Sequence, residues 1–307
     1  IRKDLARLGI VMDIYSSENQ LVKEDKVSSA IQKLQRDNLI YRGKPEPPKG
    51  KLDEDWEPRE QLLFRSKDFG DDVDRPLQKS DGSWTYFASD VAYHYDKLER
   101  TNGKLIDVLG ADHSGYVKRM TAAVQAMSGK QDRLQVKQCG LVPLLDKGKP
   151  VKMSKRAGAF VTLSDVIDAV SADVMRFVML TRRNDQPLEF DYAKVTEKSR
   201  ENPVFYVQYA HARAKSVLRQ NQKPFGTPNL SLLTDIFEIR VIKQLSRWPK
   251  QVEAATHNCE PHRIAFYLME LAAVFHGLWN AGRENYDLKF IHDSDDELTH
   301  ARMLLVE

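Results

Sequence analysis

The spacing of apolar residues predicts alternating strands and helices in the middle of the chain. Leu105–Gly110 is a short apolar run that ends in glycine, which is typical of a buried strand. Residues 116–126 have apolar positions at helical spacing, and residues 136–145 resemble a second strand. A strand, a helix and a strand of these lengths predict a βαβ unit, whose parallel sheet binds ligands at the carboxyl ends of its strands.

Helical patterns flank this unit on both sides. Residues 1–45 are expected to be helical and to end at a break rich in proline and glycine. Thr162 and Asp165 have the spacing of a capping box, and Ser171 is expected to cap the next helix. From about Tyr192 onward the spacing is helical, over residues 204–219, 230–250 and 263–279. The fold class is therefore α/β followed by a helical bundle.

Composition limits the class of protein further. The 307 residues are 41% hydrophobic and 30% charged, which is ordinary for a globular chain. No apolar stretch approaches the ~18 residues that a membrane span needs, so we expect no membrane partner. Cys139 and Cys259 match no disulfide or zinc spacing, and no signal peptide is visible, which favours a cytoplasmic protein. The chain begins at Ile1 and stops within an apolar helical pattern, so we expect it to be part of a longer protein.

The net charge of +3 hides an asymmetry along the chain. Residues 194–250 contain eleven basic and four acidic side chains and have a net charge of +7, whereas residues 284–307 have a net charge of −5. A basic helical segment suits a polyanion, although a solvated helix face would have the same charges.

The strongest local motif is Lys152-Met153-Ser154-Lys155, which a further cation, Arg156, follows. Ammonium groups on a loop suit the triphosphate of a nucleotide, because they can close over the charge that develops on a leaving pyrophosphate. A basic surface turn would share this composition, and only the order of the residues favours the nucleotide site.

Two further motifs have side chains suited to a polar substrate. Tyr86 and Asp90 are four residues apart and share a face at the start of a predicted helix, where a hydroxyl beside a carboxylate can bind a guanidinium. Asp112 and His113 follow the strand Leu105–Gly110, at the end where open α/β sheets bind ligands. The alternatives are a surface aspartate with a core tyrosine in the first motif, and a helix-capping histidine in the second.

In this order, the motifs make the chain resemble the arginyl-tRNA synthetases over nearly its whole length, with the bacterial form the better match. The matching stretches are Phe69-Gly-Asp-Asp-Val-Asp-Arg75, Asp81-Gly-Ser-Trp-Thr-Tyr-Phe-Ala-Ser-Asp90, Gly110-Ala-Asp-His113, Met153-Ser-Lys-Arg-Ala-Gly158 and Val207-Gln-Tyr-Ala-His-Ala-Arg213. The run that ends at Asp90 is more specific than Lys-Met-Ser-Lys, which all class I synthetases can contain.

The resemblance implies a ligase that joins L-arginine to ATP as arginyl-adenylate and then transfers the arginyl group to tRNA-Arg. It implies three groups of site residues: Tyr86, Asp90 and His113 for arginine; Lys152, Met153, Ser154 and Lys155 for ATP, with Lys152 and Lys155 catalytic; and Tyr206, Tyr209 and Arg213 for tRNA. The last three share a helix face, where aromatic and guanidinium groups can stack on loop bases, although at least one of the tyrosines is expected to pack in the bundle core. Mg²⁺ is expected to arrive with ATP, without a dedicated protein metal site, and the enzyme is expected to be a monomer.

The resemblance also implies a division into domains. Residues 1–65 would be a mainly helical connective region of the catalytic domain. Residues 66–193 would be the second half of its Rossmann-like parallel-sheet nucleotide-binding fold, and residues 194–307 a truncated all-α anticodon-binding bundle. The His-x-Gly-His element of class I synthetases does not occur and would precede Ile1, so these residues alone are expected not to aminoacylate tRNA.

Two other functions remain open at this point. One is a non-catalytic tRNA-binding module derived from a synthetase, against which the intact Lys152-Met153-Ser154-Lys155 motif and the Tyr86–Asp90 pair both argue. The other is an unrelated nucleotidyl-transfer enzyme of the same superfamily, which would not explain the Tyr86–Asp90 pair or the basic bundle.

Overall fold

The computed structural model describes residues 1–47, 59–151, 161–199, 201–221 and 228–307. The chain forms two compact units: residues 12–141, and residues 1–11 together with residues 142–307.

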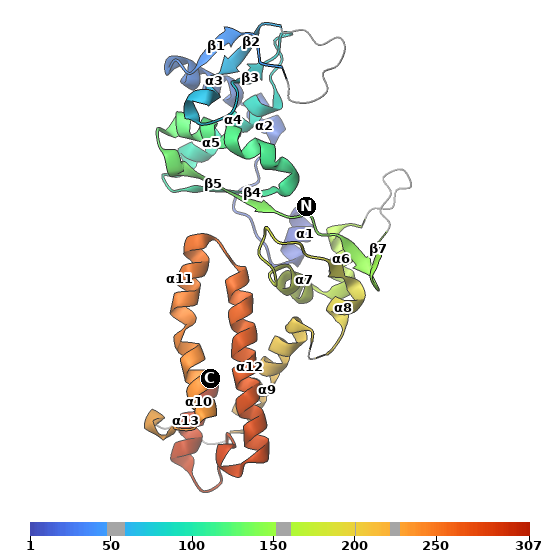
Figure 1. The fold of residues 1–307 in the computed structure, drawn as a ribbon, viewed down its shortest axis with the longest axis vertical. Coiled ribbons are helices and arrows are strands. Elements are labelled where there is room, and N and C mark those ends of the chain that lie inside the picture. Colours follow the sequence, from blue (N-terminus) through green and yellow to red (C-terminus); the bar gives the residue numbers. More distant parts are fainter. Residues whose placement is uncertain (48–58, 152–160, 200, 222–227) are drawn as a thin grey trace. The chain divides into compact units, whose positions relative to one another are not determined.

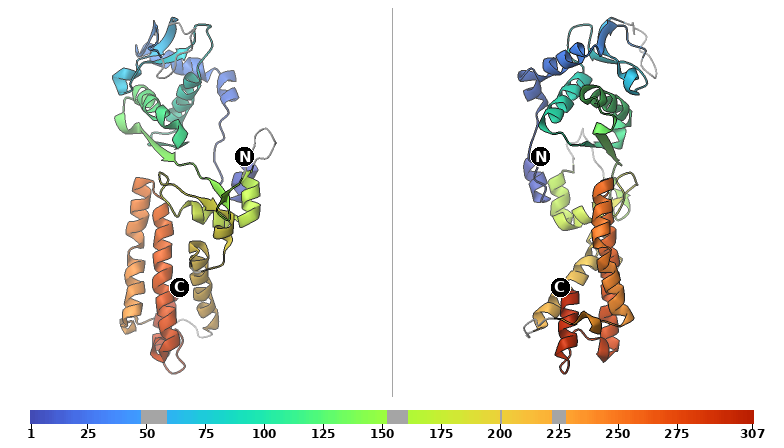
Figure 2. Two further views of the ribbon diagram at one scale, coloured as in Figure 1. Left: turned by 45° about the vertical axis from the view of Figure 1, so that its right-hand side comes forward. Right: turned by 90° about the vertical axis from the view of Figure 1, so that its left-hand side faces the viewer.

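In the unit of residues 12–141, helices lie between two sheets (Figures 1 and 2). The antiparallel sheet has the order β1 (Ile40–Gly43), β2 (Gln61–Phe64) and β3 (Arg75–Gln78), and the parallel pair is β4 (Leu105–Gly110) and β5 (Leu134–Cys139). The helices are α2 (Glu18–Lys23), α3 (Lys26–Arg36), α4 (Tyr86–Arg100) and α5 (Ser114–Ser128), with 3₁₀ turns at Ser66–Phe69, Ala111–His113 and Gln131–Arg133. The predicted βαβ unit, β4–α5–β5, is therefore confirmed. Leu34, Phe64, Val91 and Val124 belong to one core that these elements share.

The second unit begins with a small sheet and short helices. The sheet has the order β7 (Lys149–Pro150), β6 (Leu144–Asp146) and β8 (Phe190–Asp191), and the helices are α1 (Arg2–Arg7), α6 (Leu163–Val170), α7 (Ala172–Met179) and α8 (Tyr192–Thr196). The capping box of Thr162 and Asp165 and the cap at Ser171 are both confirmed, because each side chain accepts the expected backbone hydrogen bond.

The rest of this unit is a helical bundle. Its helices are α9 (Pro203–Gln220), α10 (Ile236–Ser246), α11 (Trp248–Asn258), α12 (His262–Glu284) and α13 (Asp296–Val306), with 3₁₀ turns at Leu230–Leu232 and Tyr286–Leu288. The central helix, α12, packs against α9, α10 and α11. By length and composition α12 could cross a membrane, which differs from the expectation from sequence. Its buried Ala272, Phe275 and Leu278 lie in the bundle core, as in the core helix of a bundle.

Three expected elements differ from the structure. Residues 1–45 are not helical throughout, because Ile40–Gly43 is a strand that pairs with β2. Residues 136–145 do not form one strand, because β5 ends at Cys139 and Gly140 and Pro143 separate it from β6.

The third difference is in the bundle, where residues 230–250 do not form one helix. Asp235 and Glu238 make a capping box that starts α10, and Pro249 lies in the first turn of α11. Capping residues and proline both favour a helix start, so the chain divides here even though its apolar spacing continues.

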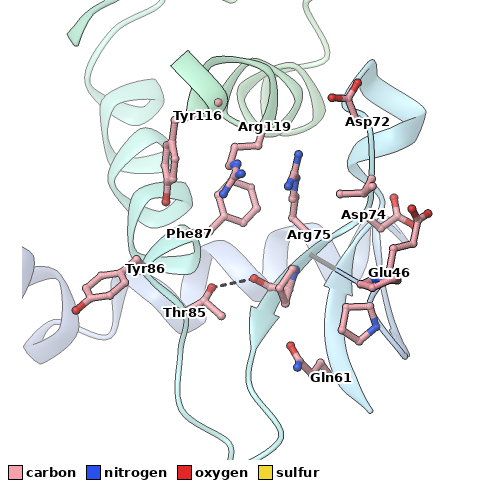
Figure 3. Close-up of a pocket in the computed structure, with 15 residues that line it drawn as sticks. Glu46, Gln61, Asp72, Asp74, Arg75, Thr85, Tyr86, Phe87, Tyr116 and Arg119 are labelled. Carbon is pink, nitrogen blue, oxygen red and sulfur yellow. Dashed lines mark hydrogen bonds between the residues drawn. The ribbon is translucent and has the colours of Figure 1, made fainter. Parts of the chain in front are cut away.

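The start of α4 is fixed to β3. The Thr85 side chain accepts a hydrogen bond from the backbone of Ala88 and donates to the Pro76 carbonyl at 2.9 Å (Figure 3). The Thr85 backbone N–H also donates to the Leu77 carbonyl at 3.0 Å. These bonds give a partner to a backbone N–H at the start of the helix and fix the helix against β3. They therefore set the direction in which Tyr86, the first residue of the helix, points.

A buried ion cluster holds the middle of α4 against β4. The His94 ring lies between two acceptors, the Asp90 carbonyl oxygen and an Asp107 carboxylate oxygen, each 2.7 Å from a ring nitrogen. The Asp90 carbonyl oxygen can only accept, so the His94 ring nitrogen that faces it donates. The Lys97 ammonium donates to the other Asp107 oxygen at 2.8 Å. Burial would raise the Asp107 pKa, but the hydrogen bonds and charges of His94 and Lys97 outweigh it and lower that pKa from 3.8 to about 2.

This cluster leads to a prediction about stability and pH. Because the folded pKa of Asp107 lies below its unfolded value, the carboxylate stabilises the fold above pH ~4 and loses that effect as the pH falls toward 2. We expect Asp107→Asn to lower the free energy of unfolding by about 2 kcal/mol at neutral pH. In urea titrations, the difference from wild type should narrow below pH ~4.

The matched control is Asp132→Asn, which neutralises an exposed carboxylate in the same unit. A gap between Asp107→Asn and wild type that stays constant from neutral pH to pH 2.5 would contradict the role of the ion cluster.

A second buried ion pair stabilises the bundle. Arg302 Nε donates to Glu238 at 2.7 Å, and the two side chains are only 4% and 1% exposed. Arg302 also donates to the Lys289 carbonyl at 2.5 Å and lies 2.9 Å from His292 Nε2. Nε and Nη1 of the guanidinium therefore both have partners.

We expect Arg302→Met to destabilise the bundle by about 3–5 kcal/mol, because it leaves the Glu238 carboxylate buried without its counter-ion. Urea unfolding followed by helical circular dichroism measures this loss. Arg219→Met, at an exposed position of α9, should change stability by less than about 0.5 kcal/mol. Equal losses in the two variants would show that the buried pair has no special role.

Candidate functional site

Tyr86 and Asp90 line one hollow at the start of α4, as their spacing predicts. We call it the Asp90 hollow; it has a volume of about 280 Å³ and is lined by Ser16, Glu18, Leu21, Tyr86, Ser89, Asp90 and Tyr93. Its lining contains two carboxylates and no lysine or arginine. Tyr86 is 83% exposed, so its ring is available to a ligand. The arrangement favours a cationic ligand with several hydrogen-bond donors.

Tyr116 of α5 completes this region, and the sequence analysis did not assign it a role. Its hydroxyl donates a hydrogen bond to Asp90, and burial together with that carboxylate raises the Tyr116 pKa to about 12. The phenol therefore stays protonated at neutral pH and can orient Asp90. Only the packing of α5 against α4 brings the two residues together, so no local motif could have shown the contact.

His113 lies next to this group but outside the Asp90 hollow. It precedes α5, its side chain is 59% exposed, and its ring meets the Tyr116 ring edge-on at 6.4 Å. Asp112 lies 3.7 Å from its Nε2. His113 makes no side-chain capping hydrogen bond, which argues against the helix-cap alternative. Tyr116 thus connects the residues predicted from two separate motifs.

Lys152, Met153, Ser154 and Lys155 lie outside the described residues, but the segment before them is well defined. The buried Asp191 of β8 accepts hydrogen bonds from the backbone of Lys147 and Gly148, in the turn between β6 and β7. Burial would raise the Asp191 pKa, but these backbone hydrogen bonds and those from α8 lower it overall. A buried carboxylate therefore anchors the hairpin that leads to Val151.

In the bundle, Tyr206, Tyr209 and Arg213 lie on one face of α9. The Arg213 guanidinium carbon lies 4.2 Å from the centre of the Tyr209 ring and 4.9 Å from that of Trp279. Arg213 also donates to His276 Nδ1 at 3.0 Å, which leaves the other His276 nitrogen to donate to the Tyr206 carbonyl at 3.2 Å. The side chains that the sequence analysis missed here, Trp279 and His276, come from α12.

The two tyrosines differ in exposure. Tyr206 packs against the bundle core, as was expected for at least one of them, whereas Tyr209 is 56% exposed. Tyr209, Arg213 and Trp279 line a shallow surface hollow of about 630 Å³, together with Arg219 and Arg283. Aromatic rings with three arginines suit bases and phosphates of a single-stranded nucleic acid.

The chain matches two protein-family models. The model described as "tRNA synthetases class I (R), catalytic domain" matches residues 56–213, and "DALR anticodon binding domain" matches residues 207–307. The second model therefore covers most of the bundle, which the sequence analysis assigned to an anticodon-binding domain.

Curated and solved relatives agree with these matches. The chain is 57% identical over 313 residues to the arginine–tRNA ligase of Ruegeria pomeroyi and 54% identical over 318 residues to that of Rhodospirillum rubrum. These alignments cover 99% and 100% of the chain and 54% of each relative, so the chain spans about half the length of these proteins. A crystal structure from Campylobacter jejuni, described as an arginyl-tRNA synthetase, superposes with a TM-score of 0.82 at 30% identity and covers 100% of this chain and 63% of that one. Because the catalytic-domain model alone matches more than half of its residues, the chain belongs to the family of class I arginyl-tRNA synthetases.

Proposed function

We propose that the protein containing this chain is an arginine–tRNA ligase. The observation that carries the proposal is the Asp90 hollow, where the Asp90 carboxylate, oriented by Tyr116, lies beside Tyr86 in an acidic lining. A guanidinium presents a planar fork of donors that matches a carboxylate, so this hollow selects arginine over neutral or acidic amino acids. In the proposed role, Asp90 binds the guanidinium, Tyr86 covers it, and His113 contacts the substrate from the start of α5.

The proposed reaction has two steps. An oxygen of the arginine carboxylate attacks the α-phosphorus of ATP, and the bond to the bridging oxygen breaks so that pyrophosphate leaves. A hydroxyl of the terminal tRNA ribose then attacks the carbonyl carbon of arginyl-adenylate, and AMP leaves. No protein nucleophile is needed, and catalysis consists of positioning and charge stabilisation.

The charges that develop on the phosphates need cationic partners. We assign this role to Lys152 and Lys155, with Met153 and Ser154 in the same ATP-binding loop, on the basis of the motif alone. Mg²⁺ arrives as part of the ATP substrate and neutralises further charge on the phosphates. In the same proposal, the enzyme is a cytoplasmic monomer.

The bundle is proposed to bind the anticodon loop of tRNA-Arg. Tyr209 and Arg213 supply an exposed ring and a guanidinium on which unpaired bases can stack, and Tyr206 supports them from the bundle core. The net positive charge of residues 194–250 adds a general attraction to phosphates.

The arginine site is tested by Asp90→Asn in the full-length protein. Removing one charge of a hydrogen-bonded ion pair costs about 2–5 kcal/mol, so we expect kcat/KM for arginine in tRNA charging to fall about 10²–10³-fold. Asp96→Asn is the matched control, because Asp96 is on the same helix but pairs with Lys26 and Arg100. Equal effects of the two substitutions would remove Asp90 from the site. Tight tRNA binding by a wild-type protein that does not charge tRNA would favour the non-catalytic module instead.

The anticodon site is tested by Tyr209→Ala. We expect it to weaken binding of a tRNA-Arg transcript about tenfold, because stacking on one base contributes about 1–3 kcal/mol. A transcript with altered anticodon bases should show a much smaller change. Tyr286→Ala is the matched control, since Tyr286 is also about half exposed and has a cation, Lys289, over its ring. If Tyr209→Ala weakens both transcripts equally, the α9 face does not read the anticodon.

A further inference from the structure

A larger cleft lies beside the Asp90 hollow within the same unit. It has a volume of about 810 Å³, and its lining includes Arg75 and Pro76 of β3, Tyr86 at the start of α4, and Tyr116 and Arg119 of α5 (Figure 3). Tyr86 lines both spaces, so the cleft begins where the Asp90 hollow ends. Its volume is within the range of sites that hold a nucleotide-sized ligand.

The acidic side chains of the cleft already have partners within the protein. Lys67 pairs with Glu46 at 3.2 Å, Lys118 pairs with Asp72 at 2.9 Å, and Asp74 accepts a hydrogen bond from the Tyr41 hydroxyl at 2.8 Å. Glu46 and Asp72 are therefore partly neutralised before any ligand binds, whereas Asp74 accepts its hydrogen bond from a neutral group.

The two guanidiniums of the cleft differ from each other. Arg75 forms a two-bond ion pair with the buried Asp71, at 2.6 and 2.7 Å. Arg119 forms no ion pair with any carboxylate of the described residues, and its Nε is buried without a hydrogen-bond partner. A buried donor without a partner is costly, so a residue that keeps one is a candidate for binding a ligand.

Arg119 is also held in a fixed orientation. Its guanidinium carbon lies 4.7 Å from the centre of the Tyr116 ring, and Figure 3 shows its side chain between Tyr116 and Arg75. Burial and the neighbouring positive charge of Arg75 both lower the Arg119 pKa. An anion placed between the two guanidiniums would relieve their repulsion.

We propose that Arg119 binds a backbone phosphate near the 3′ end of tRNA. This inference rests on the proposed function, which requires the terminal ribose to reach an arginine bound at Asp90. Because Tyr86 separates the Asp90 hollow from the cleft, the nucleotides that precede that ribose would lie along the cleft, with a phosphate between Arg119 and Arg75. The exposed Tyr86 ring offers a surface on which the terminal base can stack. The phosphates of ATP are a second source of the same chemistry, and the test separates the two.

The test compares Arg119→Gln with wild type in the full-length protein. Binding is measured with two transcripts of tRNA-Arg, one complete and one lacking its three 3′-terminal nucleotides. We expect Arg119→Gln to weaken binding of the complete transcript about tenfold and to leave binding of the shortened one unchanged. Arg119→Lys, which keeps the charge, should recover part of the loss. Arg36→Gln removes an exposed arginine of α3 in the same unit and should change neither value.

Thermal stability and the kinetics of tRNA charging distinguish a wrong role for Arg119 from a wrong proposed function. We expect Arg119→Gln to leave the melting temperature unchanged or raised, because it removes a like-charge repulsion, whereas a merely structural arginine would lower it. A loss of affinity that is equal for both transcripts, or a rise in KM for ATP with unchanged tRNA binding, would overturn the inference. If the wild-type protein does not charge tRNA with arginine at all, the proposed function fails. If it does, and Arg119→Gln behaves like wild type in every assay, only the role of Arg119 fails.

Discussion

The site depends on one constraint, which is that α4 is fixed on both sides of Asp90. Thr85 ties the start of the helix to β3, and His94 ties its middle to Asp107 of β4. His94 also donates to the carbonyl oxygen of Asp90 itself, so the backbone that carries the carboxylate is held directly. The proposed role of Asp90 as a receptor for a guanidinium depends on this rigidity, because a bidentate pair tolerates only small errors in position and angle.

Charged side chains have two different roles in this protein, and the number of their ionic partners distinguishes them. In the His94–Asp107 and Arg302–Glu238 clusters, the buried groups facing one another are paired, so these clusters fix one helix against a neighbouring element. The Arg119 guanidinium has the Tyr116 ring beneath it and a like charge beside it, but it forms no ion pair with a carboxylate of the described residues. A cluster in which every charge is paired stabilises the fold. A cation without a paired anion can instead be stabilised by an anionic ligand.

Local signals in the sequence predicted the parts of the fold that depend on neighbouring residues. The capping box at Thr162 and the cap at Ser171 are present as expected. Leu105–Gly110 is a strand, but it is not buried on both faces as predicted, because Ile106 and Val108 are exposed. One wrong prediction, the single strand over residues 136–145, also has a local cause. Gly140 and Pro143 interrupt the strand, although the apolar spacing alone would continue it. The i, i+4 spacing also placed Tyr86 and Asp90 together. It could not have shown Tyr116 or Arg119, because they reach the site only through the packing of α5.

Tyr116 lines the larger cleft and also contacts Asp90 of the neighbouring hollow. Its hydroxyl donates to Asp90 on one side, and its ring lies under the Arg119 guanidinium on the other. Because its pKa is raised to about 12, it stays neutral and can make both contacts at once. A phenolate here would repel Asp90 and pair with Arg119, so it would weaken orientation of the carboxylate and occupy the cation. One protonated phenol thus lies between the acidic lining of the Asp90 hollow and the Arg119 guanidinium and keeps the two groups apart, as the proposed reaction between a cationic amino acid and a polyanionic nucleic acid requires.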